Sequence, residues 1–99
     1  MYESIRDKLR EKIRSLDYVM TIHAEEEMEN DGLSILDIEE AILNGTIAER
    51  QKDLESGEFK YVVRGKTSYD VVVTVVSKLA VSGKMVIITV YLEHVEYEN

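Results

Sequence analysis

The chain has 99 residues, of which 44% are hydrophobic and 32% are charged, and its formal net charge at pH 7 is -8. This length suits a single domain spanning residues 1–99, and the balance of residue types is typical of a globular chain rather than a disordered one. The lack of cysteine excludes disulfides and thiolate metal sites. No apolar run reaches the roughly 20 residues of a membrane-spanning helix, and the start MYESIRDKLR lacks the apolar core of a signal peptide, so we expect a cytoplasmic protein without a membrane anchor.

The first predicted elements are three helices. Residues 3–16 carry apolar side chains at helical spacing and are predicted to form an amphipathic helix. The following DYVM is predicted to be a link. Thr21 can cap a second helix that ends at Gly32. The spacing of serine and aspartate in SILD is that of a capping box for a third helix, which an Asn-Gly pair ends.

After the third helix the apolar residues alternate, as they do in strands. Four strands are predicted, in the segments TIAER, EFKYVVRG, DVVVTVV and KMVIITVYLE. Short connections between them indicate an antiparallel meander. We therefore expect an α+β fold in which the N-terminal helices pack on a small four-stranded, mainly antiparallel sheet.

Alternation along the last strand predicts which side chains share a face. One face would carry Val86, Ile88, Val90 and Leu92, and the other would carry Met85, Ile87, Thr89 and Tyr91. We expect the helices to cover the first face, which is drier. The second face would then stay open, together with Lys60 and Arg64.

Charge is distributed unevenly along the chain. Residues 21–45 carry eight acidic and no basic side chains, whereas residues 59–84 carry five basic and one acidic. Because salt screens charges beyond about 10 Å, a basic region can attract phosphate despite a negative total. The same pattern is found on ordinary solvated surfaces. Charge alone therefore neither excludes nor requires RNA as a partner.

The ordered segments HAEEEM, GLSILDIEEAILNG, FKYVVRG and VIITVYL, within about residues 20–92, resemble a prokaryotic domain family of unknown function. Its pattern has an HA-x-x-x-M helix and a closing I-I-T-[VL]-Y strand, and it distantly resembles the RelE, ParE and BrnT toxins of toxin–antitoxin pairs. The resemblance implies a RelE-like fold, a small antitoxin-like partner, and a metal-independent endoribonuclease activity on mRNA, free or at the ribosome. The family pattern commonly has arginines where this chain has Glu27 and Asp31. Acids there would repel phosphate, which favours partner binding or a lapsed activity.

RNA cleavage without a metal needs a general base, cations near the phosphate and a proton donor. His23 could act as base or acid, Arg64 with Lys66 could hold phosphate, and a tyrosine could donate a proton or stack on a base. The candidate catalytic residues are His23, Arg64 and Tyr91, and the candidate substrate-binding residues are Lys60, Tyr61, Lys66 and Thr89. No metal or cofactor is expected, because His23 and His94 are the only histidines.

Three alternatives remain open. His23, in the first turn of a helix, could instead donate a ring N–H to a backbone carbonyl and pack at the edge of the core. The open face could dock a small partner protein without chemistry, with Tyr91 and Met85 buried in the contact. A homodimer through an edge strand such as TIAER is compatible with either function.

Overall fold

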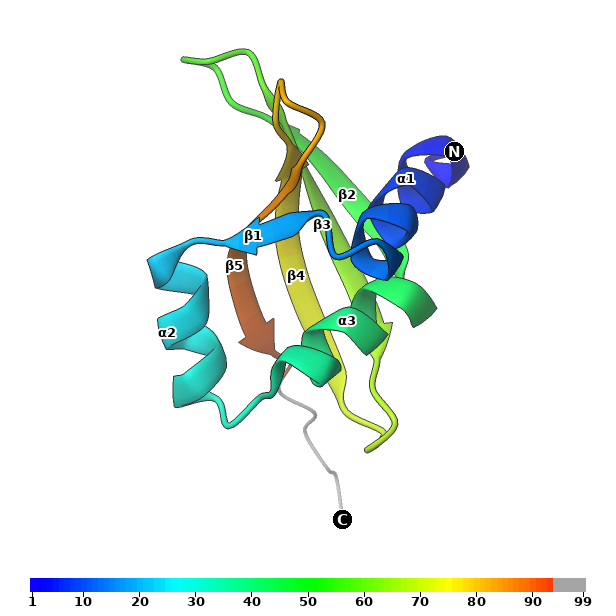
Figure 1. The fold of residues 1–99 in the computed structure, drawn as a ribbon, viewed down its shortest axis with the longest axis vertical. Helices are drawn as coiled ribbons and strands as arrows, with labels where there is room; N and C mark the ends of the chain where they lie inside the picture. Colours follow the sequence, from blue (N-terminus) through cyan, green and yellow to red (C-terminus); the bar gives the residue numbers. More distant parts are fainter. Residues whose placement is uncertain (94–99) are drawn as a thin grey trace.

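The computed structural model describes residues 1–93, which form three helices and a five-stranded sheet (Figure 1). The elements are α1 (Glu3–Arg14), β1 (Tyr18–Met20), α2 (Ile22–Asn30), α3 (Ile35–Asn44), β2 (Thr46–Lys52), β3 (Phe59–Lys66), β4 (Val72–Leu79) and β5 (Met85–Leu92). The strand order is β1-β5-β4-β3-β2, with β1 parallel to β5 and the other pairs antiparallel. The predicted α+β class and the meander from β2 to β5 are confirmed, but the sheet is mixed and has a fifth strand.

The second and third helices begin at their predicted caps. At the start of α2 the Thr21 hydroxyl accepts a hydrogen bond from the Ala24 N–H. At the start of α3, Ser34 and Asp37 exchange both hydrogen bonds of a capping box. Within the described part of the chain, no helix is both long and apolar enough to cross a membrane.

The segment DYVM, predicted to be a link, contains the strand β1. Tyr18 lies opposite Met85 and Met20 lies opposite Ile87 in the parallel pairing with β5. The Tyr18 hydroxyl donates to Glu39 of α3 at 2.7 Å, which ties the short strand to the helix layer. Burial, followed by this hydrogen bond, raises the pKa of Tyr18 to about 12.

A β-bulge in β5 changes which residues of this strand face the helices. Thr89 and Ile87 pair with consecutive residues of β4, so Ile88 between them has no partner on that strand. The extra residue shifts the alternation by one, and Met85, Ile87 and Val90 are all fully buried in the core. The prediction that Met85 and Ile87 lie on the open face is therefore wrong.

The helix α3 lies close to β3 because two glycines leave room for it. A Cβ atom on Gly65 would lie 2.0 Å from the carbonyl oxygen of Ala41, and one on Gly45 would lie 2.3 Å from the same oxygen. All three helices contribute to one core with β3, β4 and β5, formed by Leu9, Ile13, Ala24, Ile38, Ala41, Ile42, Tyr61, Val63, Val73, Val75, Met85, Ile87 and Val90. Figure 1 shows α3 crossing in front of β3 and β4. We call the sheet face that points away from this core the open face.

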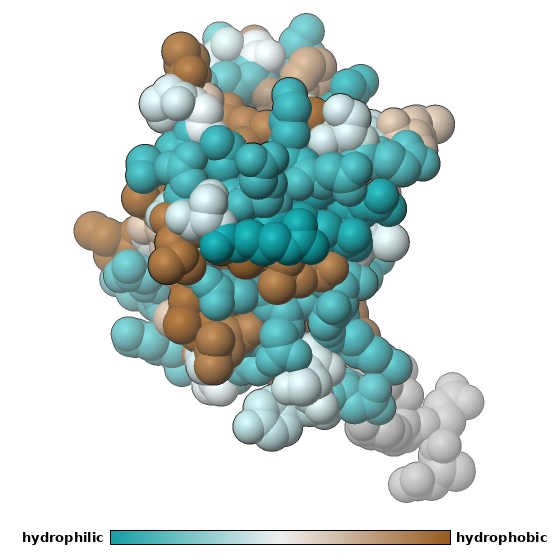
Figure 2. All heavy atoms as spheres, turned by 45° about the vertical axis from the view of Figure 1, so that its right-hand side comes forward, coloured by the Kyte–Doolittle hydropathy of each residue, from teal (hydrophilic) through white to brown (hydrophobic). Residues whose placement is uncertain are grey.

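The surface on the helix side is mostly hydrophilic. Figure 2 shows hydrophilic residues across much of the surface that is turned towards the viewer, with hydrophobic groups in separate patches. Several of the most exposed large hydrophobic side chains lie in different connections, among them Leu16, Leu54 and Val81. These three residues belong to the α1–β1, β2–β3 and β4–β5 connections, respectively.

Candidate functional site

The open face carries a row of hydrogen-bonding side chains that crosses four strands. In the registers of β2 to β5, the residues that lie directly opposite one another are Thr46, Arg64, Thr74 and Tyr91. Directly opposed residues of antiparallel strands point to the same face and are close neighbours. Two of the three predicted catalytic residues, Arg64 and Tyr91, therefore share this row.

Arg64 and Thr74 converge on one carboxylate oxygen. Arg64 Nε donates to Glu93 Oε1 at 2.9 Å, and the Thr74 hydroxyl donates to the same oxygen at 2.7 Å. The hydrogen bond from Thr74 lowers the pKa of Glu93, burial partly opposes this, and the charge of Arg64 lowers the pKa further. Glu93 is therefore ionised at neutral pH and occupies the centre of the row as its acceptor.

Beside this row the open face is apolar. Val62, Val76 and Thr89 lie opposite one another on β3, β4 and β5. Val62 is only 6% exposed, although it lies outside the core cluster, because its neighbours on the open face cover it. Val86, predicted to face the helices, lies on the open face because its neighbours Met85 and Ile87 face the core. The predicted substrate-binding residue Thr89 thus borders valines.

Most cations of the open face already pair with carboxylates. The ion pairs are Lys66 with Asp70 at 3.0 Å, Lys78 with Glu58 at 2.9 Å, and Arg64 with Glu93 at 2.9 Å. Among residues 1–93, Lys60 forms no ion pair. The basic region read from the sequence is therefore largely neutralised in three dimensions, and the open face has little excess charge to attract a polyanion.

His23 lies apart from this row, in the first turn of α2. Its Nε2 atom lies 3.1 Å from Glu27 Oε1, and its side chain is 68% exposed. The ring thus contacts a carboxylate rather than a backbone carbonyl, and it is not packed at the core edge. In the described part of the chain, no hydrogen bond or ion pair joins His23 to Arg64 or Tyr91. The predicted catalytic set is therefore split between α2, which carries His23, and the open face of the sheet, which carries Arg64 and Tyr91.

Side chains of α2 and of its two cap residues complete the edge of β5 where β1 ends. The hydrogen bonds run from the Thr21 hydroxyl to the Ile88 carbonyl at 3.1 Å, from the Val90 N–H to Glu27 at 3.2 Å, and from the Leu92 N–H to Asp31 at 3.1 Å. A neighbouring strand would otherwise supply these partners to the backbone. Glu27 and Asp31 thus support the sheet, and His23 contacts one of them.

Tyr61, predicted to bind substrate, faces the helices. It is 7% exposed and belongs to the core cluster. Because side chains alternate along a strand, Tyr61 and its neighbour Lys60 point to opposite faces. Lys60, Lys66 and Thr89 therefore lie on the open face, whereas Tyr61 is buried on the helix side. His94 lies outside the described residues.

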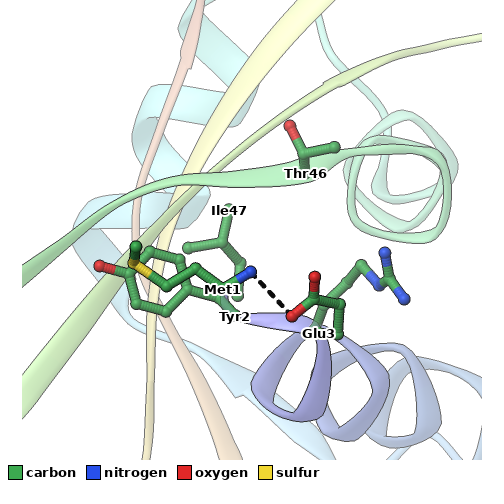
Figure 3. A pocket seen from close by; sticks show the side chains of 6 residues that line it. Met1, Tyr2, Glu3, Thr46 and Ile47 are labelled. Carbon is green, nitrogen blue, oxygen red and sulfur yellow. Dashed lines mark hydrogen bonds and ion pairs between the residues drawn. The ribbon is translucent and has the colours of Figure 1, made fainter.

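Of the row, Thr46 lines a surface hollow, whereas Arg64, Thr74 and Tyr91 line none of three hollows in the described part of the chain. This hollow lies between the start of α1 and β2, has a volume of about 260 Å³, and is also lined by Ile47, whose side chain lies on the side of Met1 and Tyr2 (Figure 3). Its one drawn interaction joins the N-terminal amine of Met1 to Glu3 at 2.8 Å. Two other hollows, of about 400 and 460 Å³, are lined by none of the predicted site residues. Within residues 1–93, no cluster of three or more histidine and acidic side chains could hold a metal ion. A flat polar and apolar surface suits a macromolecule better than a small ligand.

Two residues of the row, Thr46 and Thr74, and their acceptor neighbour Glu93 were not among the candidates from the sequence. Thr74 is the only polar residue in the run VVVTVV, a signal that marks a position facing away from the core or bonded within it. Glu93 directly follows β5 and gives no local signal, because its partners Arg64 and Thr74 come from β3 and β4.

Comparison with known proteins identifies the family. No curated protein and no solved structure matches the chain. A family profile, described as a domain of unknown function (DUF4258), matches residues 20–92. This range runs from the end of β1 to the end of β5, so it contains α2, α3 and the four strands of the open face but not α1. The chain therefore belongs to the DUF4258 family.

Proposed function

We propose that the protein is a non-catalytic binding module that docks a small partner protein through its open face, as the toxin-like member of a toxin–antitoxin type of pair. One observation carries this proposal: the helices bury one face of the sheet, while the other presents valines where a solvated face would present polar residues. Val76 and Val86 are only half-buried, and Tyr91 is 40% exposed.

The dimensions of the open face fit a small partner element. Four strands at a spacing of about 4.8 Å span about 15 Å, slightly more than the width of one helix. Tyrosine is enriched at the centres of protein interfaces because it combines a large apolar area with one polar tip. Tyr91 on β5 is therefore placed to anchor a helix or an extended segment against the valines of β4.

An endoribonuclease is the second candidate, in the RelE-like fold that the sequence resembles. It is favoured by the placement of Arg64, Tyr91, Lys60 and Thr89 on a single face. Two contacts weigh against it: His23 pairs with Glu27, and Arg64 pairs with Glu93. The base and the cation would both have to leave carboxylates before acting on a phosphate.

Docking is tested with a display library of fragments of the genome that encodes the chain. Selected fragments are identified by sequencing, and their affinities are measured for the wild type and for Tyr91→Asp and Val76→Asp. We expect at least about tenfold weaker binding to both variants, because a charge would be buried in an apolar contact. The matched control is Val81→Asp, which adds the same charge in the β4–β5 turn. Fragments that bind all four proteins equally, or a selection without enrichment, would contradict docking through this face.

The nuclease is tested in bacterial cells by inducing the wild type or a His23→Ala, Arg64→Ala double variant. Protein synthesis and RNA integrity are followed after induction, since ribosomes are then present. Arrest with RNA cleavage that the double variant abolishes would establish the enzyme and overturn a purely binding role. Normal growth with folded, expressed protein supports the binding module.

The proposed homodimer concerns a different part of the sheet. β2 lies at the end of the strand order, and its residues are mostly exposed. It is therefore able to pair with a second copy of the chain. Light scattering across a dilution series tests this, and a strictly monomeric protein would remove the proposal.

A further inference from the structure

The contact between Glu93 and the row is a complete binding site for one carboxylate. A charged donor, Arg64, and a neutral donor, Thr74, aim at the same oxygen, at 2.9 and 2.7 Å. Hydrogen bonds to an ionised acceptor are stronger than those between neutral groups. The Thr74 side chain is fully buried, so its hydroxyl depends on an acceptor placed at this point.

The two donors lie on central strands, whereas the acceptor directly follows the end of β5. Arg64 and Thr74 lie opposite one another on the central strands β3 and β4. Glu93 comes directly after β5, where one backbone hydrogen bond to the Val72 carbonyl holds it. Rotation of the Glu93 side chain alone would therefore free the site without breaking any strand pairing.

Part of the arginine is still free to receive a second acceptor. The bond to Glu93 uses Nε, and within residues 1–93 neither terminal nitrogen of Arg64 makes a hydrogen bond. Its side chain is 49% exposed. A guanidinium group binds carboxylates with two parallel N–H donors. An incoming carboxylate can thus contact Arg64 before Glu93 leaves.

We infer that Arg64 and Thr74 are the receptor for an acidic side chain of the docked partner, and that Glu93 occupies this receptor until the partner displaces it. The inference rests on the docking proposed above and names the chemistry of that partner. It fits an acidic residue flanked by apolar ones, because the valines of the neighbouring row adjoin the receptor. It fits a nucleic acid poorly, because Asp70 and Glu58 already neutralise the nearby Lys66 and Lys78.

The test uses two fluorescein-labelled peptides, VEVEVE and VQVQVQ, and fluorescence anisotropy. If Glu93 leaves the receptor free about a tenth of the time, its replacement should raise the apparent affinity about tenfold. We expect Glu93→Gln to bind VEVEVE about tenfold more tightly than the wild type does, with no gain for VQVQVQ. In the Glu93→Gln background, adding Arg64→Ala or Thr74→Val should abolish the gain, while adding Arg14→Ala, on the exposed surface of α1, should preserve it.

Several results would overturn the inference. One is an equal affinity of wild type and Glu93→Gln for VEVEVE, with circular dichroism showing both folded. Another is an equal loss of affinity for VEVEVE when Arg14→Ala or Arg64→Ala is added, which would show that the gain depends on the overall charge of the protein. A gain for labelled hexauridylate as large as that for VEVEVE would assign the receptor to phosphate.

The two proposals fail in different ways. If genome fragments bind Tyr91→Asp more weakly but VEVEVE binds Glu93→Gln and the wild type with equal affinity, docking is supported and the carboxylate receptor is overturned. If VEVEVE binds Glu93→Gln more tightly and this gain needs Arg64, while the affinity of fragments is unchanged by Tyr91→Asp, the receptor is supported and docking through the valines is overturned.

Discussion

On β3, Gly65 faces α3 and its neighbour Arg64 faces away from it, and on β4 Val75 is fully buried while Val76 is half-buried on the open face. Neighbouring residues of one strand thus belong to two different environments. On the helix side, the volume of a substituted side chain decides whether the substitution is tolerated, because backbone and side chains are in close contact. On the open side it is the matching of donors, acceptors and charges. Substitutions of equal size on the two faces should therefore have unequal effects on the stability of the protein and on its binding of a partner.

The largest difference is expected between Gly65→Ala and Lys66→Ala. A methyl group on Gly65 would meet the backbone of Ala41 at 2.0 Å, so α3 must move away from the sheet. We expect a loss of at least about 3 kcal/mol in the free energy of unfolding, from overpacking. Lys66→Ala removes an exposed ion pair and should cost less than about 0.5 kcal/mol. Urea denaturation measures both, and equal losses would contradict the close approach of α3.

The next comparison is between Val75→Ala and Val76→Ala. Val75→Ala leaves a cavity in the core and should cost about 2 kcal/mol, whereas Val76→Ala should cost less than about 1 kcal/mol. Binding should show the reverse order, because only Val76 lies on the open face. Denaturation and fragment affinity are measured on the same two proteins. A larger binding loss from Val75→Ala would place the docking surface elsewhere.

Two hydroxyl groups on β4 provide a smaller contrast. Ser77 is fully buried and its Oγ has no hydrogen-bond partner within residues 1–93, whereas the Thr74 hydroxyl donates to Glu93. Ser77→Ala should therefore leave stability unchanged or raise it by up to about 1 kcal/mol. Thr74→Val keeps the shape of the side chain and should cost about 1 kcal/mol. Thermal unfolding compares the two, and a clear loss from Ser77→Ala would indicate a partner for its hydroxyl.

The smallest expected effect on stability comes from lowering the pH. The pKa of Glu93 is lowered by Thr74 and Arg64 in the folded protein. The stabilisation from this group is therefore present above its unfolded pKa of about 4.3 and is lost as the pH falls through the lower, folded value. Glu93→Gln should remove this part of the pH dependence, so the stabilities of the two proteins should converge towards acid pH. Urea denaturation at several pH values measures this. If the free energies of unfolding of wild type and Glu93→Gln changed with pH in parallel, the contact of Glu93 with Arg64 and Thr74 would be contradicted.

Local signals in the sequence predicted the helices well. Thr21, Ser34 and Asp37 act on backbone groups within three residues of themselves, so their spacing alone locates the helix starts. β1 was missed because three residues are too short for a periodic pattern, and because its partner β5 is more than 60 residues away in the sequence. Pairing between strands that are far apart in the sequence produces no recognisable pattern in the local sequence.

The candidate site was predicted in part, for a similar reason. Alternation correctly put Arg64 and Tyr91 on one face, because the rule depends only on each strand. The bulge at Ile88 could not be read from the sequence, since it depends on the register with β4, and it reversed the predicted facing of Met85 and Ile87. The pairing of His23 with Glu27 follows helical spacing, but the second role of Glu27, on β5, does not.

The hydrogen bonds from α2 to β5 also bear on aggregation. An uncovered strand edge offers backbone donors to any passing extended chain, and such edges initiate amyloid-like assembly. Glu27 and Asp31 occupy the N–H groups of Val90 and Leu92 with carboxylates, which accept hydrogen bonds but donate none. An incoming strand would have to displace two charges to pair there. We therefore expect these two acids to reduce aggregation through this edge, and arginines at the same two positions, whose side chains only donate hydrogen bonds, could not replace them in this role.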